Sequence, residues 1–308
     1  MNGTFTPMMQ KYLETKEQYK DCILFYRLGD FYEMFFDDAI TVSRELEITL
    51  TGKSCGQEER APMCGVPYHA VDGYLTRLVA KGYKVAICDQ VEDPKQAKGL
   101  VKREVTRIVT PGTILDAQAI DETKNNYIMC IVYIADRYGV SVADITTGDY
   151  FVTELPDGGK LKDEIYRFMP SEIICNEAFY MSGLDLEDLK ERFHMAVYSL
   201  ESWYFDDTAC REKLMEHFKV SSLAGLGLSD YDCGVLSAGA LLQYLLETQK
   251  NDLSHMTRIT PYTTGKYMML DSSTRRNLEL CETLREKQKR GSLLWVLDKT
   301  KTAMGARM

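Results

Sequence analysis

Residues 24–36 read LFYRLGDFYEMFF and decide how the first part of the chain folds. An apolar run typical of a strand meets Gly29-Asp30, and a helical pattern follows that corner. Apolar residues then recur at helical spacing, with charged residues on the other side, at positions 31, 34, 35, 39, 42 and 46. The stretch therefore predicts a strand, a corner and a helix that begins at Phe31.

Two residues at this corner have both a structural and a functional interpretation. Asp30 is a favourable N-cap, and Glu33, three residues later, completes a capping-box pattern. Glu33 is therefore either a helix cap or a hydrogen-bond acceptor displayed at the corner. Phe31 either begins the buried stripe of the helix or forms a flat apolar wedge at the surface. Local sequence leaves both pairs of alternatives open.

Composition describes a globular protein with more than one domain. The chain has 308 residues, of which 45% are hydrophobic and 27% are charged. No apolar run of about 18 residues occurs, so no membrane span is expected, and the N-terminus has no signal-peptide pattern. The nine cysteines are scattered and form no CxxC motif, which argues against a zinc site or a disulfide framework. The expected location is a reducing cytoplasm.

The net charge of −9 is unevenly distributed, so it does not exclude a polyanionic partner. Residues 1–115 carry 15 basic and 16 acidic residues, residues 116–265 carry 12 and 25, and residues 266–308 carry 10 and 5. Between positions 95 and 110, Glu104 is the one acid among five basic residues, which are Lys95, Lys98, Lys102, Arg103 and Arg107. A nucleic acid could therefore bind the ends of the chain while the acidic middle stays away from it.

The remaining patterns predict two regions of strands and helices. The first region ends near residue 115 and is expected to be mixed α/β, with strands at 47–51, 83–88 and 105–109, a loop at 52–60 and a helix at 71–79 that ends at Gly82. The second region is expected to hold an antiparallel meander at 127–135, 139–146 and 148–155, a strand at 171–175 and an apolar helix at 235–249. Residues 275–289 are predicted to be helical.

Sequence patterns for nucleotide binding, metal binding and catalysis are weak. Gly52-Lys53-Ser54 matches the end of a P-loop, but the glycine that this motif requires five residues earlier is Glu47. The four histidines are too far apart to predict a metal site. The meander leaves one alternative function, a metal-dependent nuclease on a ribonuclease-H-like domain, with carboxylates from Asp136, Asp144 and Asp149. Its first strand contains no carboxylate, which counts against this alternative.

Several long strings resemble the MutS family of DNA mismatch-repair proteins. They follow the family order along the whole chain and comprise residues 6–13 (TPMMQKYL), 27–35 (RLGDFYEMF), 62–70 (PMCGVPYHA), 107–113 (RIVTPGT), 270–280, 291–294 and 298–305. The resemblance implies a mixed-sheet α/β mismatch-binding domain at 1–115 and a ribonuclease-H-like connector domain at 116–265. The first helices of an all-α core domain are expected at 266–308.

The resemblance also implies what accompanies these domains. A lever, a DNA clamp and an ATPase domain are expected to follow, so the chain is interpreted as the N-terminal portion of a longer protein. No catalysis and no cofactor are expected in this portion, because ATP and Mg²⁺ belong to the C-terminal domain of the full-length family member. The implied partners are mismatched duplex DNA, a second subunit in a homodimer, and the repair protein MutL at the connector. The implied location is the bacterial cytoplasm, in association with the nucleoid.

The resemblance assigns Phe31 the role of a wedge and Glu33 that of a base acceptor, in addition to its expected role as a cap. A mispaired step is poorly stacked, so inserting an aromatic ring from the minor groove is less costly there than in paired DNA. The kinked duplex then recruits phosphate contacts. A carboxylate near phosphates is tolerated only if it accepts a hydrogen bond or is protonated. Neighbours expected to approach the DNA are Leu28, Asp30, Lys53, Met63 and Gly65.

Overall fold

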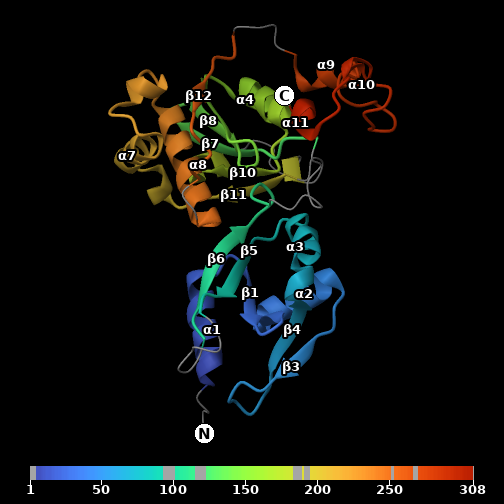
Figure 1. Cartoon of the computed structure of the whole chain (residues 1–308). Coiled ribbons are helices and arrows are strands. Elements are labelled where there is room, and N and C mark those ends of the chain that lie inside the picture. Colours follow the sequence, from blue (N-terminus) through green and yellow to red (C-terminus); the bar gives the residue numbers. More distant parts are fainter. Residues whose placement is uncertain are drawn as a thin grey trace. The chain divides into compact units, whose positions relative to one another are not determined.

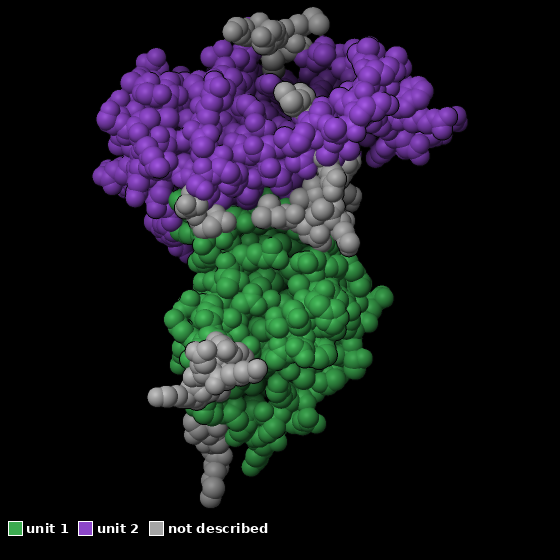
Figure 2. Space-filling model, viewed as in Figure 1, with its two compact units in different colours: residues 1–119, 246–252 green, residues 120–245, 253–308 purple. Residues whose placement is uncertain are grey.

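The chain forms two compact units, which Figure 2 shows in different colours. The structure is a computed structural model that describes residues 5–92, 101–114, 123–182, 189–190, 195–250, 253–265 and 270–307. Unit 1 comprises residues 1–119 and 246–252, and unit 2 comprises residues 120–245 and 253–308. Both units contain a mixed sheet with helices, which confirms the predicted mixed α/β class.

Unit 1 is built on a six-stranded sheet with the order β3-β4-β2-β1-β5-β6. Its strands are β1 (Ile23–Leu28), β2 (Phe31–Phe35), β3 (Thr51–Lys53), β4 (Ala61–Pro67), β5 (Val85–Gln90) and β6 (Arg103–Val109). Its helices are α1 (Pro7–Gln18), α2 (Phe36–Leu46), the 3-10 turn η1 (Tyr68–Ala70) and α3 (Val71–Val79). The pair β1–β5 is parallel, and the other neighbouring strands are antiparallel.

The two faces of this sheet pack against different helices (Figure 1). Alternate side chains along a strand point to opposite faces, so each strand can serve two cores. Leu24 and Tyr26 of β1 pack in one buried cluster with Tyr12 of α1. Phe25 of β1 packs in the other cluster, with α2 and with Leu75 of α3. The result is a layer of sheet between α1 on one face and α2 with α3 on the other.

The predicted helix start at Phe31 is wrong, because residues 31–35 form a strand. Gly29 has φ +61°, a left-handed conformation that favours glycine, and it lets the chain reverse so that Leu28 pairs with Phe31 in a hairpin. Helix α2 begins at Phe36, and no side chain caps it. Asp30 and Glu33 therefore do not form a capping box. The first turn of α2 carries Asp37 and Asp38, whose charges favour a helix N-terminus.

Elsewhere in unit 1, helices and strands are predicted correctly where apolar residues recur at a regular spacing. The helix at 71–79 is confirmed, and Gly82 follows it with φ +84°. Strands β5 and β6 each start two residues away from the predicted positions 83 and 105. The strand predicted at 47–51 is wrong: α2 ends at Leu46, Glu47 after it has a left-handed conformation, and β3 begins only at Thr51. Strand β4 was not predicted, because its two prolines and its glycine are typical of loops.

Unit 2 contains a second six-stranded sheet, with the order β11-β10-β7-β8-β9-β12. Its strands are β7 (Ile128–Ile134), β8 (Arg137–Asp144), β9 (Asp149–Leu155), β10 (Glu172–Cys175), β11 (Ala196–Ser199) and β12 (Thr260–Pro261). The antiparallel meander β7–β8–β9 is confirmed, and so is the strand near 171–175. Strands β10 and β11 continue the sheet parallel to β7. The sheet of unit 2 therefore contains both antiparallel and parallel pairs.

Helices complete unit 2. Those that the structure describes up to residue 250 are α4 (Gly158–Phe168), α5 (Glu177–Tyr180), η2 (Ser202–Phe205), α7 (Asp207–Phe218), η3 (Leu223–Leu226) and α8 (Cys233–Gln249). The predicted helix at 235–249 corresponds to α8. The start of α8 lies against β8 at Gly139, where a Cβ would be 2.0 Å from the Cys233 carbonyl oxygen. Only glycine permits this approach.

Within residues 270–307, which the structure describes, the C-terminal segment has three short helices, α9 (Ser272–Asn277), α10 (Leu293–Leu297) and α11 (Ala303–Arg307). The predicted helix at 275–289 is wrong beyond Asn277, since Glu279 and Lys287 adopt left-handed conformations that interrupt a helix. Several apolar side chains of this segment, including Leu278 and Leu297, are exposed. Across the described parts of the chain, none of the helices combines the length and apolar character that crossing a membrane requires.

Candidate nucleic-acid interface

The strand register of unit 1 brings most of the predicted site residues onto one face of the sheet. Leu28 pairs with Phe31 across β1 and β2, and Glu33 pairs with Gly65 across β2 and β4. Directly paired residues project to the same face, and so do residues two apart along a strand. Met63, two residues before Gly65, therefore shares this face. Lys53 of β3 pairs with residue 61 of β4, which lies two residues before Met63, so Lys53 is on this face as well.

Phe31 is displayed at the surface. It begins β2, immediately after the turn, and 46% of the residue is exposed. The next residue, Tyr32, points to the opposite face and is buried there with Met34. The interpretation of Phe31 as a core residue is therefore wrong. Successive side chains of a strand point to opposite faces, so Phe31 points away from the buried cluster that contains Tyr32 and Met34. Asp30 lies in the turn itself, where its carbonyl oxygen accepts a hydrogen bond from the Tyr68 amide at 3.0 Å.

Glu33 forms an ion pair with Lys53. The Lys53 ammonium donates to Oε2 of Glu33 at 2.5 Å and lies 5.7 Å from the centre of the Phe35 ring. The Glu33 side chain passes beside Gly65, where an added Cβ would be 3.5 Å from its Cγ and 3.3 Å from the Tyr32 carbonyl oxygen. A side chain at Gly65 would therefore crowd the Tyr32 carbonyl oxygen of the neighbouring strand, while its distance to Glu33 is that of an ordinary van der Waals contact. The structure brings together an apolar ring, a carboxylate and an ammonium group, from two strands that are 20 residues apart in sequence.

A second set of side chains, which no sequence pattern predicted, holds the hairpin in place. The Arg27 guanidinium lies over the Tyr68 ring at 3.7 Å, and the Tyr32 hydroxyl donates to Asp89 at 2.6 Å. Burial, and then the hydrogen bond to Asp89, raise the pKa of Tyr32, so its hydroxyl remains a donor. Arg103 donates to the Arg27 carbonyl oxygen at 2.7 Å. No local pattern signals these contacts, because Tyr32 and Asp89 are 57 residues apart.

The basic segment at 95–110 is less available than its composition indicates. Lys95 and Lys98 lie outside the described residues. Lys102 pairs with Glu104 at 2.6 Å, and this hydrogen bond raises the pKa of Lys102. Arg107 lies 3.6 Å from Asp72. In the described part of this segment, carboxylates therefore offset two of the basic charges.

Two of the carboxylates proposed for a nuclease, Asp144 and Asp149, are paired across β8 and β9, but the third does not converge with them. Asp136 and Asp144 lie at opposite ends of β8, which at about 3.3 Å per residue separates them by more than 20 Å. Asp144 is buried and accepts hydrogen bonds from the amides of Asn126 at 3.0 Å and Thr146 at 2.8 Å, as a turn-capping residue does. Among the residues that the structure describes, no three His, Cys, Asp or Glu side chains are placed to hold a metal ion.

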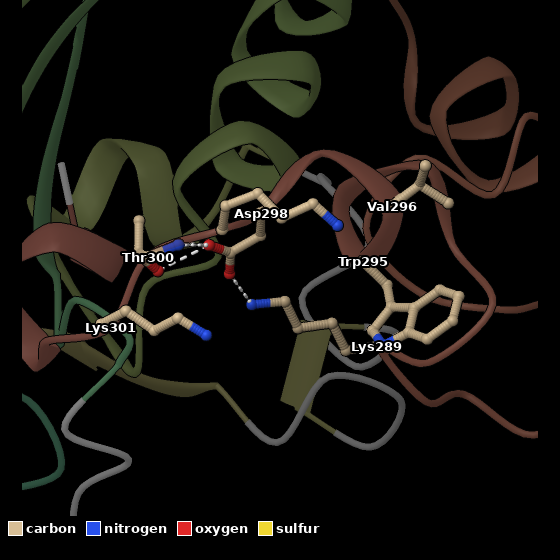
Figure 3. Close-up of a pocket in the computed structure, with 7 residues that line it drawn as sticks. Lys289, Trp295, Val296, Asp298, Thr300 and Lys301 are labelled. Carbon is tan, nitrogen blue, oxygen red and sulfur yellow. Dashed lines mark hydrogen bonds and ion pairs between the residues drawn. The ribbon is translucent and has the colours of Figure 1, made fainter.

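Unit 2 contains a cavity of about 480 Å³ near the C-terminal end of the described chain. Figure 3 shows Lys289 and Asp298 pointing toward each other in it, with Thr300 on the other side of the carboxylate. Hydrogen bonds from Lys289 and Thr300 hold the pKa of Asp298 well below its ordinary value. The Asp298 charge is thus already matched within the chain, and none of the predicted site residues lines this cavity.

Comparison with known families covers nearly the whole chain. The family model of MutS domain I matches residues 6–118, that of MutS domain II matches residues 126–257, and that of MutS domain III matches residues 273–308. The chain belongs to the MutS family. All seven predicted site residues lie within the match to MutS domain I.

Individual MutS relatives agree with this assignment. The chain is 69% identical over 303 residues to the DNA mismatch repair protein MutS of Lachnoclostridium phytofermentans, covering 98% of this chain and 32% of that protein. It is 56% identical over 309 residues to the DNA mismatch repair protein MutS of Ruminiclostridium cellulolyticum, covering 99% of this chain and 35% of that protein. The chain thus spans about a third of the length of these curated relatives.

Proposed function

We propose that this chain recognises mispaired or unpaired bases in duplex DNA through the face of unit 1 that carries Phe31 and Glu33. One observation carries the proposal: an exposed aromatic ring at a hairpin turn lies beside a carboxylate on the same face of the sheet. Exposed aromatic rings of this kind are available to stack on bases. The similarity to proteins named for DNA mismatch repair supports the same function.

The proposed recognition step is insertion of Phe31 at a weakened base step. A mispaired step has lost part of its stacking and pairing energy, so separating it from its neighbour requires less free energy than separating a paired step. Leu28 and Met63 would support the ring as an apolar surface, and Gly65 would let the backbone approach the DNA. The inserted ring would sense how easily the DNA is deformed and would not contact base edges. The chain would therefore prefer a mispaired site over paired DNA, whatever the surrounding base sequence.

Glu33 would discriminate among the bases that the wedge displaces. A carboxylate accepts hydrogen bonds and repels phosphates, so it favours a site at which a base offers it a donor. Lys53 would contact a phosphate of the kinked duplex, and Asp30 would lie near the DNA at the turn. These roles agree with the position of all these residues on or beside one face of the sheet.

We further propose the division into a mismatch-binding domain at 1–115, a connector at 116–265 and the start of a helical core domain at 266–308, which the three family matches support. This portion would act by binding, without catalysis of its own. In the longer protein, ATP and Mg²⁺ would be used by another domain, two subunits would form a homodimer, and MutL would bind at the connector. The site of action would be the nucleoid in the cytoplasm.

The test is binding of the chain to a paired duplex and to an otherwise identical duplex with one G·T mismatch, each at 50 and 200 mM salt. We expect tighter binding of the mismatched duplex, with affinity for both falling as salt rises, because phosphate contacts release counterions. Equal affinity for the two duplexes would contradict mismatch recognition. Magnesium-dependent nicking of DNA would instead indicate a nuclease.

A further inference from the structure

The ion pair between Glu33 and Lys53 has a consequence for how DNA is recognised. Both partners of this pair are predicted to contact DNA, yet in the free protein they bind each other, with 2.5 Å between the ammonium nitrogen and the carboxylate oxygen. The Glu33 side chain is only 15% exposed and that of Lys53 is 34% exposed. A carboxylate with so little access to water is unfavourable without a hydrogen-bonding partner.

The two partners differ in their freedom to leave the pair. Glu33 lies on β2, inside the sheet, with β1 and β4 on either side. Lys53 is the last residue of β3, the edge strand, and its side chain is a flexible four-carbon stem with three donors. When the pair opens, the ammonium group is therefore the partner that can move outward to a phosphate, while the carboxylate stays at the wedge.

We propose that Glu33 holds Lys53 back from the DNA and that a mispaired base releases it. On paired DNA, no displaced base reaches Glu33, so moving Lys53 to a phosphate would leave an unpartnered carboxylate among phosphates. The ion pair then stays closed. On mismatched DNA, a displaced base donates a hydrogen bond to Glu33, and Lys53 becomes free to contact a phosphate. Base recognition at Glu33 thereby adds one phosphate contact at Lys53. This inference rests on the proposed mismatch-binding function.

The salt dependence of binding measures this contact directly. Each phosphate that a cation neutralises adds about 0.9 to the slope of log affinity against log salt, which is roughly a threefold change in affinity between 50 and 200 mM salt. In the full 308-residue chain, we expect Lys53→Met to reduce the slope by about 0.9 on a G·T duplex and to leave it unchanged on the paired duplex. A lysine that always contacted phosphate would reduce both slopes equally.

Glu33→Gln provides the reciprocal test. Without the carboxylate, Lys53 is free on either duplex, so the slope on paired DNA should increase by about 0.9. Adding Lys53→Met to Glu33→Gln should remove this increase. Lys53→Arg keeps the positive charge and should retain the difference between the two duplexes, which a loss of fold would not do.

A matched control lies on the opposite face of the sheet. Lys81 and Glu45 form an ion pair of 2.9 Å with similar exposure, 46% and 19%, in the helical layer of unit 1. Lys81→Met should leave both slopes unchanged. Thermal unfolding of each variant checks the fold, and Lys53→Gln replaces Lys53→Met if the latter unfolds.

The outcomes separate the two proposals. Suppose that the wild-type chain prefers the G·T duplex and that Lys53→Met changes the salt slope equally on both duplexes. This result would overturn the proposed release of Lys53 and leave mismatch recognition intact. The absence of any slope change on the G·T duplex overturns it as well. A wild-type chain with no mismatch preference overturns the proposed function itself.

Discussion

Replacing Phe31 with alanine should remove the preference for mismatched DNA while leaving the fold intact. Loss of one aromatic stacking contact reduces binding by about 1–3 kcal/mol, which is roughly 5- to 150-fold in affinity. The loss should fall on the mismatched duplex, because only there is the ring expected to insert. Binding to paired DNA depends on phosphate contacts and should change little.

The effect on stability follows from the position of the ring. Full burial of a phenylalanine side chain contributes about 1.5–3 kcal/mol, and Phe31 is 46% exposed, so the substitution should reduce the free energy of unfolding by only about 1 kcal/mol. A core phenylalanine would instead lose about 3–5 kcal/mol. The size of this change therefore distinguishes a surface wedge from a core residue.

The assay is fluorescence anisotropy with labelled paired and G·T duplexes, together with urea unfolding of the same preparations. Ile40→Ala is the matched control, because Ile40 is also 46% exposed but lies on α2, on the opposite face of the sheet. Its mismatch preference should equal that of the wild type. Unchanged discrimination in Phe31→Ala, or a loss of stability near 4 kcal/mol, would refute the wedge assignment.

Three further predictions concern stability and reactivity. Gly139→Ala should reduce the free energy of unfolding by about 3 kcal/mol in urea denaturation, because its Cβ would be 2.0 Å from the Cys233 carbonyl oxygen; a change below 1 kcal/mol would contradict the close approach. Alkylation of the native chain at pH 8 should modify the exposed Cys281 and spare the eight buried thiols. Among these thiols, burial raises the pKa of Cys88, for example, to about 12, and mass spectrometry showing several modified thiols would refute the prediction. Amide hydrogens at 278–297, where apolar side chains are exposed, should exchange faster than those of the strands at 128–155, and equal protection in a monomer would argue against it.

Short-range patterns correctly predicted the helices and strands in which apolar residues recur at a regular helical or strand spacing. The helix α3 follows from its apolar spacing, and the meander β7–β9 follows from extended runs separated by turn residues. Family strings contain six of the seven candidate site residues, and Lys53 was chosen as a basic residue of the loop predicted at 52–60. All seven lie within the match to MutS domain I. These features depend on residues close in sequence or on long identical strings, so a single chain is enough to recognise them.

The tertiary structure decided the conformation and the partners of the residues at the β1–β2 hairpin. Residues 31–35 carry a pattern that suits a helix, but they form a hairpin with β1 and pair on their other side with the distant, proline-containing strand β4. Pairing on both sides outweighs local propensity. The same pairing places Phe31 at the surface. The Glu33–Lys53 ion pair joins strands separated by β4, and the contact of Tyr32 with Asp89 spans 57 residues. The sequence by itself determined which residues are candidates for binding DNA, because their types and order are local properties. Only the tertiary structure decided which of them touch, because contacts across a sheet depend on register, and register is set by the packing of the whole domain.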